Sequence, residues 1–278
     1  PAQHRLRREL VVEVLRRDGG IDDPSVADGP AIPADGVRTT VRGTVVDGRF
    51  AYRRRRSNDP VAVDGCLVAH PLVEEVLADG RFGEATEVVV RVGARTGDRQ
   101  VVVTPTAEGV VVPPDAVVVG ADELRAGRRS WIHEEAAGRR WRVSAGSFFQ
   151  ASPEGAEALV AVIGEDLRRL APDVRTLVDL CSGVGLFAGT VGEGRSVTAV
   201  ERSASAVADA RVNLAGLDVR PIRSAMERWR PSRAEVVVAD PARSGLRREG
   251  VAAIDRTGAE VCVLVSCDLG ALGRDARL

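Results

Sequence analysis

The residues of this sequence that could do chemistry follow predicted strands in its second half. A glycine-rich turn, Asp179-Leu-Cys181-Ser-Gly183-Val-Gly185, comes after the first of these strands, and Glu201 ends the second. Glycines let a backbone turn tightly against a ligand, and an acid at the next strand end suits the two ribose hydroxyls of a nucleoside cofactor. The pattern therefore predicts a nucleoside-cofactor site, which adenosylmethionine and an NAD-type cofactor fit equally well.

Two more reactive side chains follow later strands. Asp240 opens the run Asp-Pro-Ala-Arg-Ser-Gly, and Cys267 lies in Val-Ser-Cys-Asp. Because the carboxyl ends of parallel strands meet at one edge of a sheet, we expect both side chains beside the cofactor turn. A thiolate there would be a strong nucleophile, whereas free cysteines are more often buried structural residues. We expect Cys262, inside its strand, to be such a buried residue.

The run Ser147-Phe-Phe-Gln150 joins the two halves of the sequence. Its amide could contact a cofactor or a base, and its two phenylalanines could instead hold two modules together. The functional hypothesis makes Gln150 a cofactor-binding residue.

Arginine supplies all 39 basic residues, and lysine is absent. Without lysine there can be no pyridoxal-phosphate Schiff base and no Walker A loop. The net charge of -1 gives no overall attraction to nucleic acid. Seven arginines nevertheless fall within residues 38–56 and six within residues 125–142. Because arginine binds phosphates bidentately and stacks on bases, the consecutive Arg53, Arg54, Arg55 and Arg56 indicate RNA binding, with a solvated surface as the alternative.

The elements that must position these residues change character along the chain. Helical spacing predicts a helix over 4–17, and short β-branched runs punctuated by Asp47-Gly48 and Glu108-Gly109 predict antiparallel hairpins, with one helix near 71–78. Ser152 should cap a helix that ends near Leu170. Alternating strands and helices then follow: strands at 176–180, 197–201, 219–223, 234–239 and 260–265, and a helix at 204–214.

The predicted fold is therefore α/β: a Rossmann-like parallel sheet, apparently truncated, preceded by a β-rich α+β module. We expect a helix and loop over 1–37, the β-rich module over 38–146 and the cofactor-binding domain over 147–278. Four widely spaced cysteines are no disulfide framework, and no run of about 18 apolar residues could span a membrane. These features predict a reduced, cytoplasmic, monomeric protein without a metal site or membrane contact.

Taken in order, these motifs resemble the RNA uracil-5 methyltransferase family, which makes 5-methyluridine in ribosomal and transfer RNA. The resemblance covers nearly the whole chain. It implies that Cys267 is the catalytic nucleophile and that S-adenosylmethionine is the cofactor. It also implies RNA as the partner and the following cofactor-binding residues: Gln150, Asp179, Cys181, Gly183, Gly185, Glu201 and Asp240.

The sequence also departs from the family pattern. The family's general base is a glutamate in a His-Val-Glu stretch well after the cysteine, and no such stretch occurs before Leu278. Cys66 matches one cluster cysteine of iron–sulfur members, but the other three would lie upstream, so we expect a structural role for it. We therefore expect this chain to bind cofactor better than it turns over. Two alternatives stay open: a noncatalytic RNA-binding protein on this scaffold, and an NAD(P)-linked oxidoreductase.

Overall fold

The computed structural model describes residues 2–63 and 65–278, which form two compact units. One unit, here called the central unit, comprises Ile32–Glu157. The other, called the parallel-sheet unit, combines the described residues up to Ala31 with Ala158–Leu278. The predicted domain boundaries at residues 37 and 146 remain predictions.

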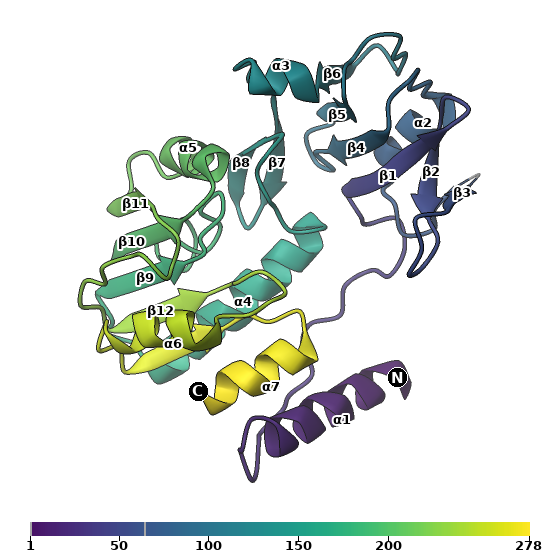
Figure 1. The fold of residues 1–278 in the computed structure, drawn as a ribbon. Coiled ribbons are helices and arrows are strands. Elements are labelled where there is room, and N and C mark those ends of the chain that lie inside the picture. The colour runs from purple at the N-terminus through teal and green to yellow at the C-terminus, as the bar shows by residue number, and fades with distance from the viewer. Residues whose placement is uncertain (1, 64) are drawn as a thin grey trace. The chain divides into compact units, whose positions relative to one another are not determined.

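A five-stranded sheet in which every pair is parallel forms the middle of the parallel-sheet unit (Figure 1). Its order is β11-β10-β9-β12-β13, so the strand order reverses between β9 and β12. In such a sheet the ligand crevice lies outside the carboxyl ends of the strands, at this reversal. The strands are β9 (Thr176–Leu180), β10 (Ser196–Glu201), β11 (Val219–Arg223), β12 (Val236–Ala239) and β13 (Val261–Leu264).

Helices follow the strands of this sheet, as expected for doubly wound α/β structure. All four residues of β12 are buried, which agrees with a central strand covered on both faces. The predicted fold class is thus confirmed. The helices are α4 (Pro153–Leu170), which begins in the central unit, α5 (Ala204–Asn213), α6 (Arg247–Asp255) and α7 (Leu269–Arg277). Ser152 Oγ accepts the Gly155 amide at 3.0 Å, which confirms the predicted N-cap of α4.

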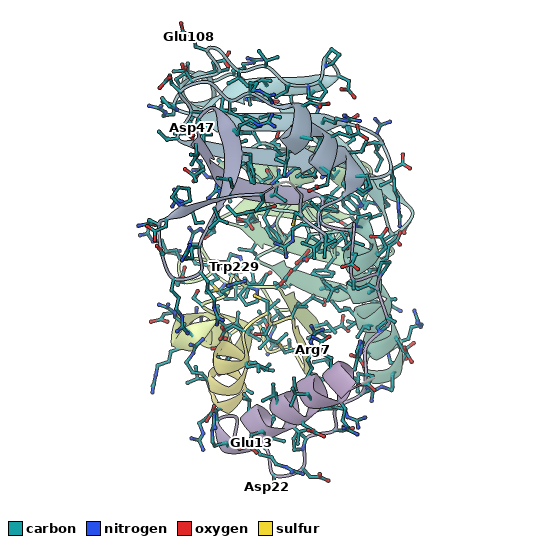
Figure 2. All side chains as sticks on the ribbon, turned by 90° about the vertical axis from the view of Figure 1, so that its right-hand side faces the viewer. Arg7, Glu13, Asp22, Asp47, Glu108 and Trp229 are labelled. Carbon is teal, nitrogen blue, oxygen red and sulfur yellow. The ribbon has the colours of Figure 1, made fainter. Side chains whose placement is uncertain are left out.

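The N-terminal helix α1 (Ala2–Arg17) packs against α7 (Figure 1). The two helices approach closely at Gly273, since a Cβ added there would lie 2.8 Å from Val14 Cγ1. Arg7 and Glu13 are exposed residues of α1 (Figure 2). Among the described residues, no helix combines the length and apolarity that crossing a membrane requires.

A six-stranded sheet dominates the central unit, in the order β3-β2-β1-β4-β5-β6. The strands β1 and β2 form the hairpin predicted at Asp47-Gly48, where both residues have positive φ. The helix α2 (Pro71–Asp79) buries Val73 and Val76 in the core of this unit. The strands are β1 (Thr40–Val46), β2 (Arg49–Arg53), β3 (Pro60–Ala62), β4 (Glu87–Val92), β5 (Arg99–Thr104) and β6 (Ala116–Gly120).

The predicted hairpin at Glu108-Gly109 is wrong, because β6 pairs with β5 in the parallel direction. A tight turn reverses the chain, whereas a parallel neighbour needs a longer connection, which residues 105–115 provide. A separate two-stranded sheet follows α3 (Ala121–Arg125): β7 (Trp131–Ala136) and β8 (Arg139–Ser144) form an antiparallel hairpin through Ala137-Gly138.

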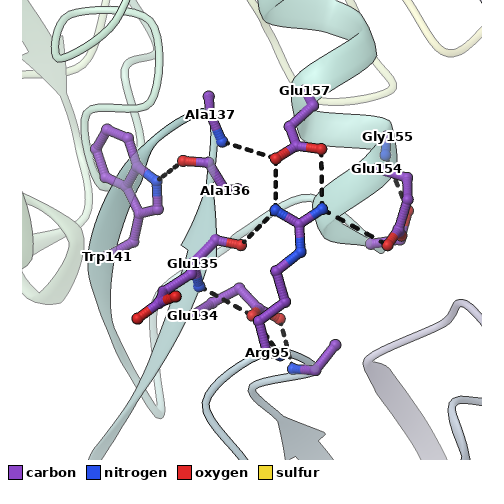
Figure 3. A network of polar contacts seen from close by, with 11 residues as sticks. Arg95, Glu134, Glu135, Ala136, Ala137, Trp141, Glu154, Gly155 and Glu157 are labelled. Carbon is purple, nitrogen blue, oxygen red and sulfur yellow. Dashed lines mark hydrogen bonds and ion pairs between the residues drawn. The ribbon is translucent and has the colours of Figure 1, made fainter.

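A polar network fastens this hairpin within the central unit (Figure 3). The Glu134 carboxylate, 1% exposed, accepts the backbone amides of Ala94 and Arg95 at 2.7 and 3.1 Å. The Arg95 guanidinium forms a bidentate pair with Glu157 near the start of α4, including a 2.9 Å bond, and lowers the pKa of Glu157 to about 2. The β4–β5 turn, the hairpin and the start of α4 are therefore held as one polar assembly.

Candidate cofactor site and nucleophile

The turn after β9 depends on left-handed backbone at three of its residues. Cys181, Gly183 and Gly185 have φ of 65, 55 and 97°. A Cβ at Gly185 would lie 2.7 Å from Leu214 Cδ1, so this position excludes side chains on steric grounds as well. Asn213 at the end of α5 donates its amide to the Val184 carbonyl at 3.0 Å. The end of helix α5 therefore holds the turn in place.

Glu201 connects the end of β10 to this turn. One carboxylate oxygen accepts the Gly183 amide at 3.0 Å, and the other accepts the Ser203 amide at 2.6 Å. Each oxygen has a further lone pair that can accept a hydroxyl hydrogen. Glu201, which the sequence predicts to bind two ribose hydroxyls, is thus held beside the turn by two backbone donors.

Asp179 lies fully buried at the end of β9. Its Oδ2 accepts the Ala188 amide at 2.8 Å, while its buried Oδ1 has no hydrogen-bond partner. Burial raises the pKa of Asp179 to about 7, and the nearby carboxylates of Asp240 and Glu201 add to the increase. The hydroxyl of Ser182 is likewise buried without a partner. Two unsatisfied polar atoms in one turn are the pattern expected where a ligand group completes the hydrogen bonding.

The Cys181 side chain is half-buried, and four surrounding acids act on it, the weakest of them Glu227. Burial raises its pKa to about 12, with further increases from the charges of Glu201, Asp179 and Asp240. This thiol therefore stays protonated and is a poor nucleophile. Asp240 itself follows β12, where its amide donates to the Leu180 carbonyl at 3.2 Å. That bond places Asp240 directly beside the end of β9.

Cys267 is exposed in the segment between β13 and α7. The Val265 amide bonds the Ala239 carbonyl at 2.8 Å, so this segment leaves the sheet beside the Asp240 loop. Asp268 caps α7 by accepting the Ala271 amide at 2.9 Å. A cysteine at this place is accessible to a large substrate. The expectation that Cys262 is buried is wrong: it is exposed, because β13 is the last strand of the sheet.

Sequence reasoning assigned no role to Asp275, which ties the Asp240 loop to α7. Its carboxylate accepts the Leu246 amide at 2.6 Å and the Arg247 amide at 3.2 Å, and it pairs with Arg274 at 2.8 Å. Arg274 also donates to the Ser244 carbonyl at 2.7 Å. The bonds from residues 274 and 275 reach across about 30 positions of the chain, so no local pattern could reveal them. They fix the loop after β12 to the helix that begins beside Cys267.

The parallel-sheet unit thus brings together most of the predicted cofactor and catalytic residues at the carboxyl edge of one sheet: Asp179, Cys181, Gly183, Gly185, Glu201, Asp240 and Cys267. Gln150 and the four arginines Arg53–Arg56 belong to the central unit, and their roles remain predictions. The arginines are exposed around the turn after β2. Phe149 packs near Trp141 with ring centroids 6.4 Å apart, so at least one phenylalanine of the joining run serves packing within that unit.

Comparisons with known proteins identify relatives of this chain. The chain is 34% identical, over 99% of its length, to an uncharacterized RNA methyltransferase of Streptomyces coelicolor, and 30% identical to one of Streptomyces avermitilis. It spans 66% and 70% of these two relatives, about two thirds of their length. No protein-family model matches the chain.

A solved structure shares the fold over almost the whole chain. The Pyrococcus abyssi tRNA (uracil-54, C5)-methyltransferase, solved in complex with S-adenosyl-L-homocysteine, superposes with a TM-score of 0.73. The superposition covers 99% of this chain and 76% of the Pyrococcus abyssi protein, at 20% sequence identity. At this identity the similarity establishes the fold, a class I methyltransferase sheet preceded by a β-rich module.

Proposed function

Since the chain belongs to the family of RNA methyltransferases represented by these Streptomyces relatives, we propose that it methylates carbon 5 of a uridine in RNA, using S-adenosylmethionine and a covalent adduct to Cys267. The observation that carries the proposal is the placement of an exposed cysteine beside the cofactor edge of the sheet. RNA methyltransferases that act on nitrogen or on hydroxyl groups have no need of a cysteine nucleophile, because those atoms already carry lone pairs.

The residues of the turn fit adenosylmethionine. Glu201 offers two acceptor oxygens to ribose hydroxyls, and the left-handed Gly183 and Gly185 allow the tight backbone turn that the ligand would approach. The unpartnered oxygens of Asp179 and Ser182 provide further hydrogen-bonding groups. Asp240 and Gln150 complete the proposed set. When bound, the cofactor supplies a methyl group carried on a positively charged sulfur, which the acids around the turn favour.

The chemistry of uracil explains the cysteine. Carbon 5 of uracil is too weakly nucleophilic to take a methyl group directly. Addition of the Cys267 thiolate to carbon 6 places the electron pair of the 5,6 double bond on carbon 5 and the carbonyl oxygen. Once carbon 5 carries the methyl group, a base removes its proton and the returning electron pair expels the Cys267 thiolate. The target base must leave its stack for the thiol to reach carbon 6.

RNA containing 5-fluorouridine tests the nucleophile. With fluorine on carbon 5, no proton is available for the final elimination, so the enzyme remains joined to the RNA after methyl transfer. We expect a denaturation-resistant complex that requires S-adenosylmethionine and Cys267. Cys262 provides a matched control, because it is also exposed and lies only five residues earlier. The Cys267→Ala protein should form no complex and the Cys262→Ala protein should form it normally; an adduct in the first protein would exclude the assignment.

Calorimetry separates the proposed cofactor from the NAD-type alternative. We expect S-adenosylhomocysteine to bind and NAD to show no heat. The Glu201→Gln protein should bind S-adenosylhomocysteine roughly tenfold more weakly, since a neutral amide replaces one acceptor oxygen with a donor. Tight NAD binding at the same turn would contradict the proposal.

A further inference from the structure

The β7–β8 hairpin presents an exposed tryptophan among arginines, and the proposed cofactor site uses none of these residues. Burial alternates strictly along β7, so Trp131, His133 and Glu135 face outward while Ile132, Glu134 and Ala136 face the core. Trp131 is 42% exposed, whereas the other two tryptophans, Trp141 and Trp229, are 0% and 5% exposed. An exposed indole offers a planar aromatic surface on which an unpaired base can stack.

The register of the hairpin places arginine beside this indole. Trp131 pairs with Ser144 and His133 pairs with Arg142, so Arg142 is the diagonal neighbour of Trp131. The Arg142 guanidinium lies over the Trp131 ring, 5.2 Å from its centroid. Arg128 and Arg129 immediately precede β7 and are exposed, and Arg140 is exposed on β8. These residues are called the hairpin patch: Arg128, Arg129, Trp131, Arg140 and Arg142.

The patch is more basic than the sequence suggests. Residues 125–142 hold two acids, but Glu134 faces inward at 1% exposure, where three backbone amides surround it. Only Glu135 remains on the outward face, opposite Arg140 in the hairpin register. Just outside these residues, Glu123 forms an ion pair with Arg128. The four arginines lie along the hairpin, from Arg128 and Arg129 before β7 to Arg140 near its turn, and they still outnumber the two acids, a charge balance that favours an anionic partner.

The patch differs in kind from Arg53–Arg56. Those four arginines are exposed, but the adjacent Tyr52 is half-buried and packs edge-on against Phe50 with centroids 4.9 Å apart. They offer charge for phosphates without a free aromatic surface. Single-stranded nucleic acid is bound where a basic surface is combined with an aromatic ring on which a base stacks, and arginine adds its own planar surface. In the central unit this combination is met at Trp131.

We propose that the hairpin patch binds single-stranded RNA, with one unpaired base stacked against Trp131 and Arg142 and with Arg128, Arg129 and Arg140 contacting neighbouring phosphates. The inference rests on the proposed function only in taking RNA as the partner. It makes no use of the cofactor site or of Cys267. It predicts a preference for loops and other unpaired segments, because a base already stacked within a duplex cannot lie on the indole.

Binding of the full chain to a labelled oligouridylate and to an RNA duplex of equal length, without cofactor, tests the proposal. Trp131→Ala should weaken binding to the single strand by roughly 5- to 150-fold, the range of one lost base stack, and change duplex binding little. Arg142→Lys keeps the charge but loses the planar surface, so it should weaken single-strand binding at an unchanged salt slope. Arg129→Ala should reduce the slope of log K against log salt by about 0.7.

Arg220→Ala is the matched control, since it removes an exposed arginine from β11 in the other unit and should change neither slope nor preference. Circular dichroism establishes that each variant folds, and Trp131→Phe, which retains an aromatic ring, should recover most of the lost affinity. Wild-type affinity in both Trp131→Ala and Arg142→Lys, or equal losses for duplex and single strand, would overturn the proposal. If the wild-type chain binds RNA through the patch but never forms the fluorouridine adduct, the proposed function fails and this inference stands.

Discussion

Replacing Asp179 by asparagine should change how the stability of the protein depends on pH. The buried carboxyl has a pKa of about 7 in the folded protein, against an ordinary value of 3.8 in an unfolded chain. The folded state therefore holds a proton on this group over a range in which the unfolded state has released it. Stability from Asp179 is fully present below the unfolded pKa and is lost as the pH rises towards the folded pKa.

The size of the effect follows from these two values. Integrated from pH 5 to pH 8, one group with these pKa values removes about 2.5 kcal/mol from the free energy of unfolding. Asparagine carries no charge and can still accept the Ala188 amide, which Asp179 Oδ2 bonds at 2.8 Å. The Asp179→Asn protein should therefore lack this component of the pH dependence, and its stability relative to wild type should increase by that amount between pH 5 and pH 8.

Urea unfolding at half-unit steps from pH 5 to pH 8 measures the difference, because titration of the groups that do not interact with Asp179 cancels between the two proteins. The Asp255→Asn protein, altered at an exposed residue of α6, controls for the loss of one carboxyl group. A stability difference between wild type and Asp179→Asn that stays constant to within about 0.5 kcal/mol across this range would refute the reasoning. It would mean that water or rearrangement relieves the buried carboxylate.

The same unit yields two further predictions. Gly185→Ala should destabilise the protein by about 1–3 kcal/mol in urea unfolding and weaken S-adenosylhomocysteine binding, because its Cβ would lie 2.7 Å from Leu214 Cδ1. Leu214→Ala added to it should recover part of the loss, and strictly additive losses would speak against the steric explanation. Asp275→Asn should cost about 2–4 kcal/mol, since it weakens charged hydrogen bonds to the buried Leu246 amide, to the Arg247 amide and to Arg274. The rate of fluorouridine-adduct formation should also fall in the Asp275→Asn protein. If it falls no more than the loss of folded protein explains, the bonds of Asp275 do not help to position Cys267 for the reaction.

The parts of the fold that the sequence predicts are those encoded by local patterns. The buried strands of the parallel sheet are short β-branched runs, and the N-cap at Ser152 and the hairpin at Asp47-Gly48 are local turn chemistry. The order of acids, glycines and cysteine along the chain was enough to predict the edge at which they meet, because parallel topology brings all strand ends to one side.

The features that the sequence does not predict depend on distant parts of the chain. The direction of β6 depends on the path of residues 105–115. The Glu108-Gly109 pair within that segment wrongly suggests an antiparallel hairpin. Cys262 is exposed because β13 lies at the end of the sheet, a property of the whole topology. Asp275 accepts backbone amides 28 and 29 positions away, and Asn213 donates to a carbonyl 29 positions away. Spacing within a motif carries no information about such partners.

The two ends of the parallel sheet are protected very differently against unwanted pairing. The strand at one end, β11, reads Val-Arg-Pro-Ile-Arg, and its proline and two arginines discourage a further strand from adding to it. The strand at the other end, β13, reads Val-Cys-Val-Leu, without proline or charge, and its residues are at least partly exposed. An uncharged β-branched edge is a template for strand addition. Aggregation of this chain at high concentration should therefore begin at β13, and oxidation of the exposed Cys262 thiols of two chains by dissolved oxygen would join such contacts by a disulfide.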